Sequence, residues 1–338
     1  MNYYSITINA EQVHLSFSAD GVPEKVEVDS MATAEIRQLL REQFEPKKRH
    51  NLFLADAYQV SGMNNGPDKA VRLASCARWL EFAVPPEGDD KRYKITKTSS
   101  CHVRLCPVCQ WRRSVNTYRN MAQIYAHSRL KEYKHIFVTV TQKNVPAEEL
   151  GAELKRISDA YTAMLRRKPF KDIVKGYART IEVTRNEKTG EYHPHIHAIW
   201  TVHQNYGRKV YITQEELRME WAKALGLDYL PQCNMKKIKN VDGKSLAEIS
   251  KYSVKPGDYI TNSLQESADL LRIIDPALDG KRFVSYGGLI REIKQDIFRN
   301  GNLEDIESNP IPATEWETWE RHLYEWHFSA GKYRRITV

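Results

Sequence analysis

Three histidines at alternate positions give residues 193–197 the pattern HPHIH, a set of side chains on which metal chemistry can be built. Successive side chains of a β-strand point to opposite faces, so we expect the three imidazoles to share one face. The segments 176–185 and 191–203 have the composition of two strands that flank a turn. If this hairpin pairs residues whose numbers sum to about 377, Glu182 lies opposite His195.

We therefore predict a divalent-cation site on this strand. His195 and His197 are its first two ligands, and either Glu182 or His193 is the third. Two imidazoles and a carboxylate suit Mn²⁺ or, more weakly, Mg²⁺. The alternative is a group of hydrogen-bonded histidines without a metal, which is the usual interpretation of a lone histidine but a poorer one for three on an apolar strand.

A second group with chemical potential lies further along the chain. Glu248 and Tyr252 are four residues apart in a predicted helix over 245–254, so they should be neighbours on one helical face. Lys251 and Lys255 would surround the phenol with positive charge, which favours the phenolate and a bound phosphate. A tyrosine oxygen can attack phosphorus, and a nearby carboxylate can take a proton from an attacking group.

The cysteines predict a second metal site, of a different kind. Three thiols lie close together in the sequence: Cys101, Cys106 and Cys109. Cys76 is the preferred fourth ligand and His102 the alternative, and four such ligands suit a structural, tetrahedral Zn²⁺. Cys233 stands alone and is expected to be a packed thiol.

Charge indicates a polyanionic partner. The chain has a net charge of +8, and residues 91–134 alone hold eleven Lys or Arg and one acid, 11 − 1 = +10. Because this stretch contains the cysteine cluster, we expect Arg104, Arg112 and Arg113 to face DNA. No apolar run approaches the ~20 residues of a membrane span, and the N-terminus lacks a signal-peptide pattern, so we expect a cytoplasmic protein without a membrane partner.

The elements that must position these residues follow a β-α-β-β-α-β order between residues 135 and 254. This order predicts an α+β fold, an antiparallel sheet with flanking helices of the ferredoxin or RRM type. The expected regions are a β-hairpin of unknown role (1–30), a helical, zinc-binding, basic DNA-binding region (31–133), a domain that carries the histidine strand and the tyrosine (134–300) and a helical tail (301–338).

Together these motifs resemble the HUH endonuclease superfamily, in which a histidine–hydrophobe–histidine strand holds a divalent cation and a helix supplies a tyrosine. More narrowly, the sequence is similar to the rolling-circle replication initiator (Rep) proteins of small Gram-positive plasmids. The resemblance covers residues 45–295 or so. Its matching segments are the strand 135–141, residues 182–184, residues 193–197, the tyrosine segment 248–258, the turn 286–288 and the Cys-Pro-x-Cys-x-x-Arg-Arg run.

The resemblance implies that Tyr252 attacks one phosphodiester at the plasmid double-strand origin, giving a 5′-phosphotyrosine and a 3′-OH primer. His195 and His197 would hold the cation with Glu182 or His193, and Glu248 would activate water for the terminating cleavage. Lys251 and Lys255 would bind DNA. Tyr259 is a possible second nucleophile, but Pro256 and Gly257 should break the helix before it, so we expect a structural role.

Two other functions compete with this one. A zinc-containing repressor without enzymatic activity would explain the basic cysteine region but leaves the histidine strand and the tyrosine unused. A relaxase or a transposase would share the nicking chemistry. No Walker-type glycine-rich loop occurs in the sequence, so we expect strand separation to depend on a host helicase. Both monomer and dimer are compatible with the sequence.

Overall fold

In the computed structural model the chain forms two compact units. One comprises residues Met1–Ala55, Val71–Cys101 and Glu307–Val338, and the other Asp56–Ala70 and His102–Ile306. The residues that the structure describes are 3–8, 11–17, 23–29, 31–86, 93–208, 210–238, 241, 243–299 and 316–336. Within these ranges, no helix has both the length and the apolar composition needed to cross a membrane.

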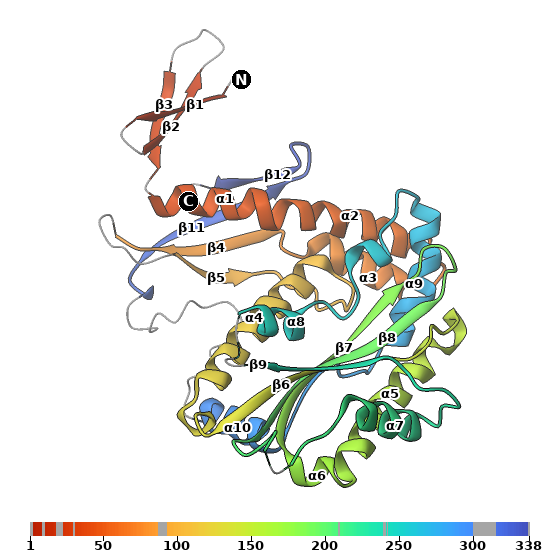
Figure 1. Cartoon of the computed structure of the whole chain (residues 1–338). Coiled ribbons are helices and arrows are strands. Elements are labelled where there is room, and N and C mark those ends of the chain that lie inside the picture. The colour runs from red at the N-terminus through yellow and green to blue at the C-terminus, as the bar shows by residue number, and fades with distance from the viewer. Residues whose placement is uncertain are drawn as a thin grey trace. The chain divides into compact units, whose positions relative to one another are not determined.

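The second unit is built on a five-stranded antiparallel sheet with the strand order β10-β7-β8-β6-β9. Its strands β6, β7, β8 and β9 are labelled in Figure 1. Its central elements are β6 (Tyr133–Val140), α5 (Leu150–Arg166), β7 (Val174–Arg185), β8 (Tyr192–His203), α7 (Gln214–Leu225) and β9 (Cys233–Ile238). β8 lies between β6 and β7 and is antiparallel to both, which is the split β-α-β arrangement. The predicted fold class and β-α-β-β-α-β order are therefore confirmed, and β10 (Val284–Gly287) adds a fifth strand.

Helices cover both faces of this sheet. The remaining elements of the unit are α4 (Pro107–Ala126), η2 (Ser128–Leu130), η3 (Ala147–Glu149), α6 (Phe170–Ile173), α8 (Gly243–Ser250), η4 (Pro256–Asp258), α9 (Leu264–Leu278) and α10 (Gly288–Arg299). On β8, Ile199 joins a buried cluster with Met121 of α4, Ile249 of α8 and Ile293 of α10. The next side chain, Trp200, points to the opposite face and donates to the hydroxyl of Tyr161 on α5 at 2.8 Å.

The alternation of side chains fixes which face carries the histidines. His195 and His197 have the parity of Ile199, so they lie on the face that α8 covers, toward the start of β8. Glu182 has the parity of Ala178, which belongs to the same cluster. These three side chains therefore lie on the face of the sheet that α8 covers, and the end of α8 leads into the segment that carries Tyr252.

The turn from β10 into α10 requires glycine. Gly288 has a φ of +52°, and a Cβ there would lie 2.2 Å from the carbonyl oxygen of Lys175. A Cβ at Gly287 would collide with the ring of Tyr177. These two glycines let the start of α10 approach β7 closely.

The first unit contains a four-stranded antiparallel sheet with the order β12-β11-β4-β5. It includes, wholly or in part, α1 (Met31–Leu39), η1 (Leu40–Phe44), α2 (Glu45–Val60), α3 (Gly66–Ser75), β4 (Trp79–Val84), β5 (Lys94–Thr98), β11 (Glu320–His327) and β12 (Lys332–Ile336). At the N-terminus, β1 (Tyr3–Ile8), β2 (Glu11–Phe17) and β3 (Pro23–Asp29) form a separate three-stranded sheet, so a third strand extends the predicted hairpin.

The prediction of a helical tail is wrong for the residues that the structure describes. The buried side chains of β11 are His322, Tyr324 and Trp326, every second residue, and this period of two belongs to a strand. β11 pairs with both β4 and β12. Residues 301–315 of the predicted tail lie outside the described residues.

Candidate functional site

The β7–β8 hairpin brings a carboxylate and two imidazoles together. Glu182 pairs with His195 across the strands, which confirms the predicted register. The Nε2 atoms of His195 and His197 lie 3.5 and 3.4 Å from the same Glu182 oxygen, Oε2. Two atoms that are both bound about 2.1 Å from one cation are separated by about this distance. The three side chains form one of two groups, among the described residues, that have the geometry to hold a metal ion.

Hydrogen bonds to the other ring nitrogens prepare the two imidazoles to bind a metal. His195 Nδ1 lies 3.2 Å from the carbonyl oxygen of His193, which only accepts, so in the neutral imidazole Nδ1 carries the proton and Nε2 keeps its lone pair for a cation. His197 Nδ1 contacts Thr139 Oγ1 at 3.0 Å. Burial raises the pKa of the Glu182 carboxyl, but hydrogen bonds and charge from the two histidines hold it well below its usual range. The donor set therefore fits a divalent cation.

The structure distinguishes between the two candidates for the third ligand. Glu182 belongs to the group with His195 and His197, whereas His193 does not. His193 shares their face of β8, and its ring lies 5.4 Å from that of His195, centroid to centroid. Burial, and then the neighbouring His195, lower the pKa of His193. Its backbone carbonyl orients His195, so its observed contact with the group is through the main chain.

Tyr252 lies just beyond a helix and not on one. The predicted helix over 245–254 is observed as α8, which ends at Ser250, so Glu248 and Tyr252 do not share a helical face. Past the helix the chain runs beside β7: the N–H of Val183 donates to the carbonyl of Ser253 at 2.8 Å, and Val183 forms a parallel bridge with Val254. This pairing holds the segment that carries Tyr252 against Val183, the residue that follows Glu182 in β7.

The predicted effect of the two lysines on the phenol is also wrong. Burial raises the pKa of Tyr252 to about 12. The charges of the lysines are compensated elsewhere, because Lys251 pairs with Glu248 at 2.6 Å and Lys255 lies 3.5 Å from Glu182 Oε1. The phenol is therefore protonated at neutral pH, and the second lysine links the tyrosine segment to the candidate metal site.

Tyr259 is completely buried, as the prediction of a structural role requires. Its hydroxyl donates to the carbonyl of Leu105 at 2.8 Å and accepts from the side-chain amide of Gln110 at 3.2 Å. Burial raises its pKa well above the ordinary value. Both contacts tie the segment that follows Tyr252 to the chain around α4.

Two of the three arginines expected to face DNA lie beside Tyr252. Arg104 and Arg113 line the same cavity as the tyrosine, whereas Arg112 is only 8% exposed and does not present a DNA-facing side chain. Neighbouring residues of a helix differ by about 100° in direction, which separates Arg112 from Arg113. The cavity also contains two cations that sequence inspection missed, Lys281 and Arg282. The only signal for them is a basic pair directly before an aromatic residue.

The second metal group is the four-cysteine cluster. The sulfur atoms of its members lie within 4.8 Å of one another: Cys76, Cys101, Cys106 and Cys109. The group includes Cys76 and not the alternative, His102, whose side chain is exposed. The N–H of Cys109 points to the sulfur of Cys106, as in a turn that presents two thiolates to one ion. Four buried thiols with this spacing fit a tetrahedral metal.

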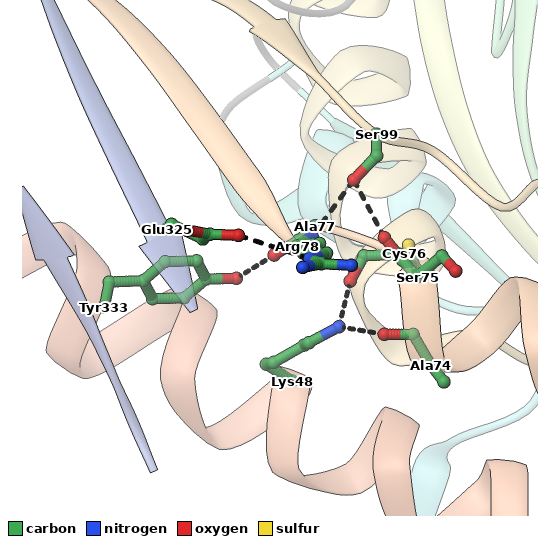
Figure 2. A network of polar contacts seen from close by, with 9 residues as sticks. All are labelled: Lys48, Ala74, Ser75, Cys76, Ala77, Arg78, Ser99, Glu325 and Tyr333. Atoms are coloured by element: carbon green, nitrogen blue, oxygen red, sulfur yellow. Dashed lines mark hydrogen bonds and ion pairs between the residues drawn. The ribbon is translucent and has the colours of Figure 1, made fainter. Parts of the chain in front are cut away.

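The backbone around Cys76 is held by a buried lysine (Figure 2). Lys48 is completely buried, and its ammonium donates to the carbonyls of Ala74 and Cys76, each at 2.6 Å. Ala77, the next residue, has a positive φ, and its carbonyl accepts from Tyr333. Cys233 is buried elsewhere, and burial raises its pKa to about 12, as expected of a packed thiol.

Comparisons with known proteins identify the family of this chain. Residues 92–334 match the family described as "Replication protein". The chain is 32% identical to a "Protein rep" of Bacillus amyloliquefaciens over 80% of this chain and 85% of that protein. It is 34% identical to a "Protein rep" of Lactiplantibacillus plantarum over 78% of this chain and 87% of that protein. No solved structure matches. The chain therefore belongs to the Rep family of replication proteins, as its sequence motifs indicated.

Proposed function

We propose that this chain initiates rolling-circle replication of a plasmid by nicking one strand at the double-strand origin. The observation that carries the proposal is the pairing of the tyrosine segment with β7 directly beside Glu182, where the carboxylate meets His195 and His197. One strand, β7, thus carries Glu182 of the candidate cation site and also pairs with the segment that holds Tyr252, the proposed nucleophile.

The oxygen of Tyr252 would attack the scissile phosphorus, and the bond from phosphorus to the 3′ oxygen would break. The proton of the phenol passes to solvent, and the leaving oxygen takes up a proton to become the 3′-OH primer. A Mn²⁺ or Mg²⁺ ion bound by Glu182, His195 and His197 would polarise the phosphate. In the terminating cleavage, Glu248 would take a proton from the attacking water.

The rest of the protein would bind and position the origin. Arg104, Arg113, Lys251 and Lys255 are the proposed phosphate contacts. We assign origin binding to the first unit and the nuclease to the second, in place of the predicted division into 31–133 and 134–300. Residues 102–133 go with the nuclease because they belong to the second unit and α4 packs in its core. A host helicase would separate the strands. The four cysteines would hold a structural Zn²⁺; Cys109→Ser should then lose one equivalent of zinc that Cys233→Ser retains.

The test is a nicking assay on supercoiled plasmid carrying the cognate origin, with wild type and Tyr252→Phe in Mn²⁺ and in EDTA. The wild type should nick only with metal and leave a protease-sensitive protein–DNA adduct, and the variant should do neither. Binding without cutting under any cation would favour the repressor. An adduct formed by the Phe variant would place the nucleophile at another tyrosine.

A further inference from the structure

A cavity opens where the outer edge of β7 changes partner. β10 pairs with β7 as far as Thr180, and the N–H of Ile181 donates to the carbonyl of Phe283 at 3.0 Å. From Val183 onward the partner is the tyrosine segment, through Ser253. The space between these two partners has a volume of about 460 Å³, within the range of sites that bind small organic groups.

The cavity adjoins the candidate reaction centre. Tyr252 lines it directly. Thr180, which also lines it, pairs across the strands with the metal-ligand candidate His197 and has the same parity as Glu182. Anything bound in this cavity therefore lies next to both the nucleophile and the cation site.

The lining is strongly cationic. Among the described residues that form it, none is acidic and five are basic: Arg104, Arg113, Lys251, Lys281 and Arg282. Lys251 is paired with Glu248, so the other four supply the net positive charge. Burial, and then the neighbouring Arg113, lower the pKa of Arg104, as expected where positive charges crowd together. Arg104 also lies over the ring of Phe283, 5.3 Å from its centroid. Cations beside an aromatic ring are the combination that holds the phosphates and bases of single-stranded nucleic acids.

Gln110 supplies a polar group suited to a base. The Tyr259 hydroxyl uses its proton on the carbonyl of Leu105, so it must accept from Gln110, and this sets the amide orientation. Gln110 is 4% exposed and lines the cavity, yet its Oε1 has no hydrogen-bond partner among the described residues. A buried acceptor without a partner is costly unless a ligand supplies the donor.

We propose that this cavity binds one unstacked nucleotide beside the scissile phosphate, with Gln110 Oε1 accepting from an N–H of its base. This inference rests on the proposed function and adds a base subsite to it. The cations hold the phosphates, the guanidinium of Arg104, which lies over the ring of Phe283, stacks on the base, and every natural base offers an N–H donor. Gln110 is thus a positioning residue: it contacts the base but does not touch the reacting atoms.

The experiment measures DNA binding without cleavage, in EDTA, by fluorescence anisotropy. The probes are oligo(dT) of about 12 nucleotides and an abasic phosphodiester oligomer of equal length. Gln110→Met should weaken binding of oligo(dT) about tenfold and leave the abasic probe unchanged, because one hydrogen bond to a base is lost. Gln142→Met is the matched control: Gln142 is 5% exposed, lies outside the cavity and should change neither probe.

A second variant covers the case in which Gln110→Met does not fold. Arg282 is exposed at the cavity, so Arg282→Ala should fold normally, weaken both probes alike and lower the slope of log affinity against log salt by about one. Lys171→Ala, which changes an exposed cation that does not line the cavity, should have no effect.

The subsite is overturned if Gln110→Met weakens both probes equally or neither, or if Arg282→Ala and Lys171→Ala behave alike. Failure of the proposed function appears separately, as wild-type protein that does not nick origin plasmid in Mn²⁺. A protein that cuts without base recognition would refute only the subsite.

Discussion

The β7–β8 hairpin and the segment that carries Tyr252 contribute to the same site in different ways. In the hairpin an antiparallel ladder runs from Val174 to Arg185, so the direction of each side chain is set by its register. The tyrosine segment begins where α8 ends, and its links to β7 include one backbone hydrogen bond, one bridge, the contact of Lys255 with Glu182 and a hydrogen bond of Asp258 to the backbone of Arg185. Ligands on strands are held more exactly than groups on irregular segments.

This difference matches what the two regions would do in the proposed reaction. A cation site needs donor atoms at fixed separations, which paired strands provide. A nucleophile must meet a phosphate that arrives with the DNA, so a segment anchored at a few points is sufficient. We therefore expect that a substitution can abolish nucleophilic attack without affecting metal binding.

The largest expected effect tests this separation. His197→Ala should lower the metal-dependent nicking rate about 10³-fold, equivalent to about 4 kcal/mol, because a cation ligand is lost. It should also weaken Mn²⁺ binding, measured by electron paramagnetic resonance. Tyr252→Phe should bind Mn²⁺ like the wild type while forming no adduct. If the Phe variant loses Mn²⁺ as well, the two regions are not separable.

The pH dependence of nicking is the next largest effect and concerns the tyrosine segment alone. Burial places the pKa of Tyr252 at about 12, so below this value the reactive phenolate fraction rises about tenfold per pH unit. Single-turnover nicking at saturating Mn²⁺ should therefore increase about 100-fold between pH 6.5 and 8.5, roughly two units. A rate that stays level over this interval would mean that the bound complex lowers the pKa of the phenol.

Sequence patterns predicted the hairpin more accurately than the tyrosine segment, for physical reasons. Alternation with a period of two and a short turn define a register, so the partner of His195 could be deduced. The choice between Glu182 and His193 stayed open because both lie next to His195 and only the side-chain geometry separates them.

Non-local contacts explain what the sequence did not reveal. The helix ends at Ser250, where its carbonyl accepts from the hydroxyl of Ser114, and Ser253 pairs with β7 in place of a further helical turn. The burial of Arg112 depends on packing around α4. Gln110 shows no sequence signal at all, because its role depends on a tyrosine 149 residues away in the chain.

The smallest expected effect concerns how firmly the β7–β8 hairpin holds the imidazole of His197 in its orientation. Thr139→Val removes the hydroxyl 3.0 Å from His197 Nδ1 while preserving the shape of the side chain. Loss of such an orienting contact should weaken Mn²⁺ binding by about 10- to 100-fold. Thr141→Val is the matched control, because Thr141 donates to the carbonyl of Gln232 and does not touch an imidazole. Equal Mn²⁺ affinities for the two variants would show that the strand ladder alone orients His197.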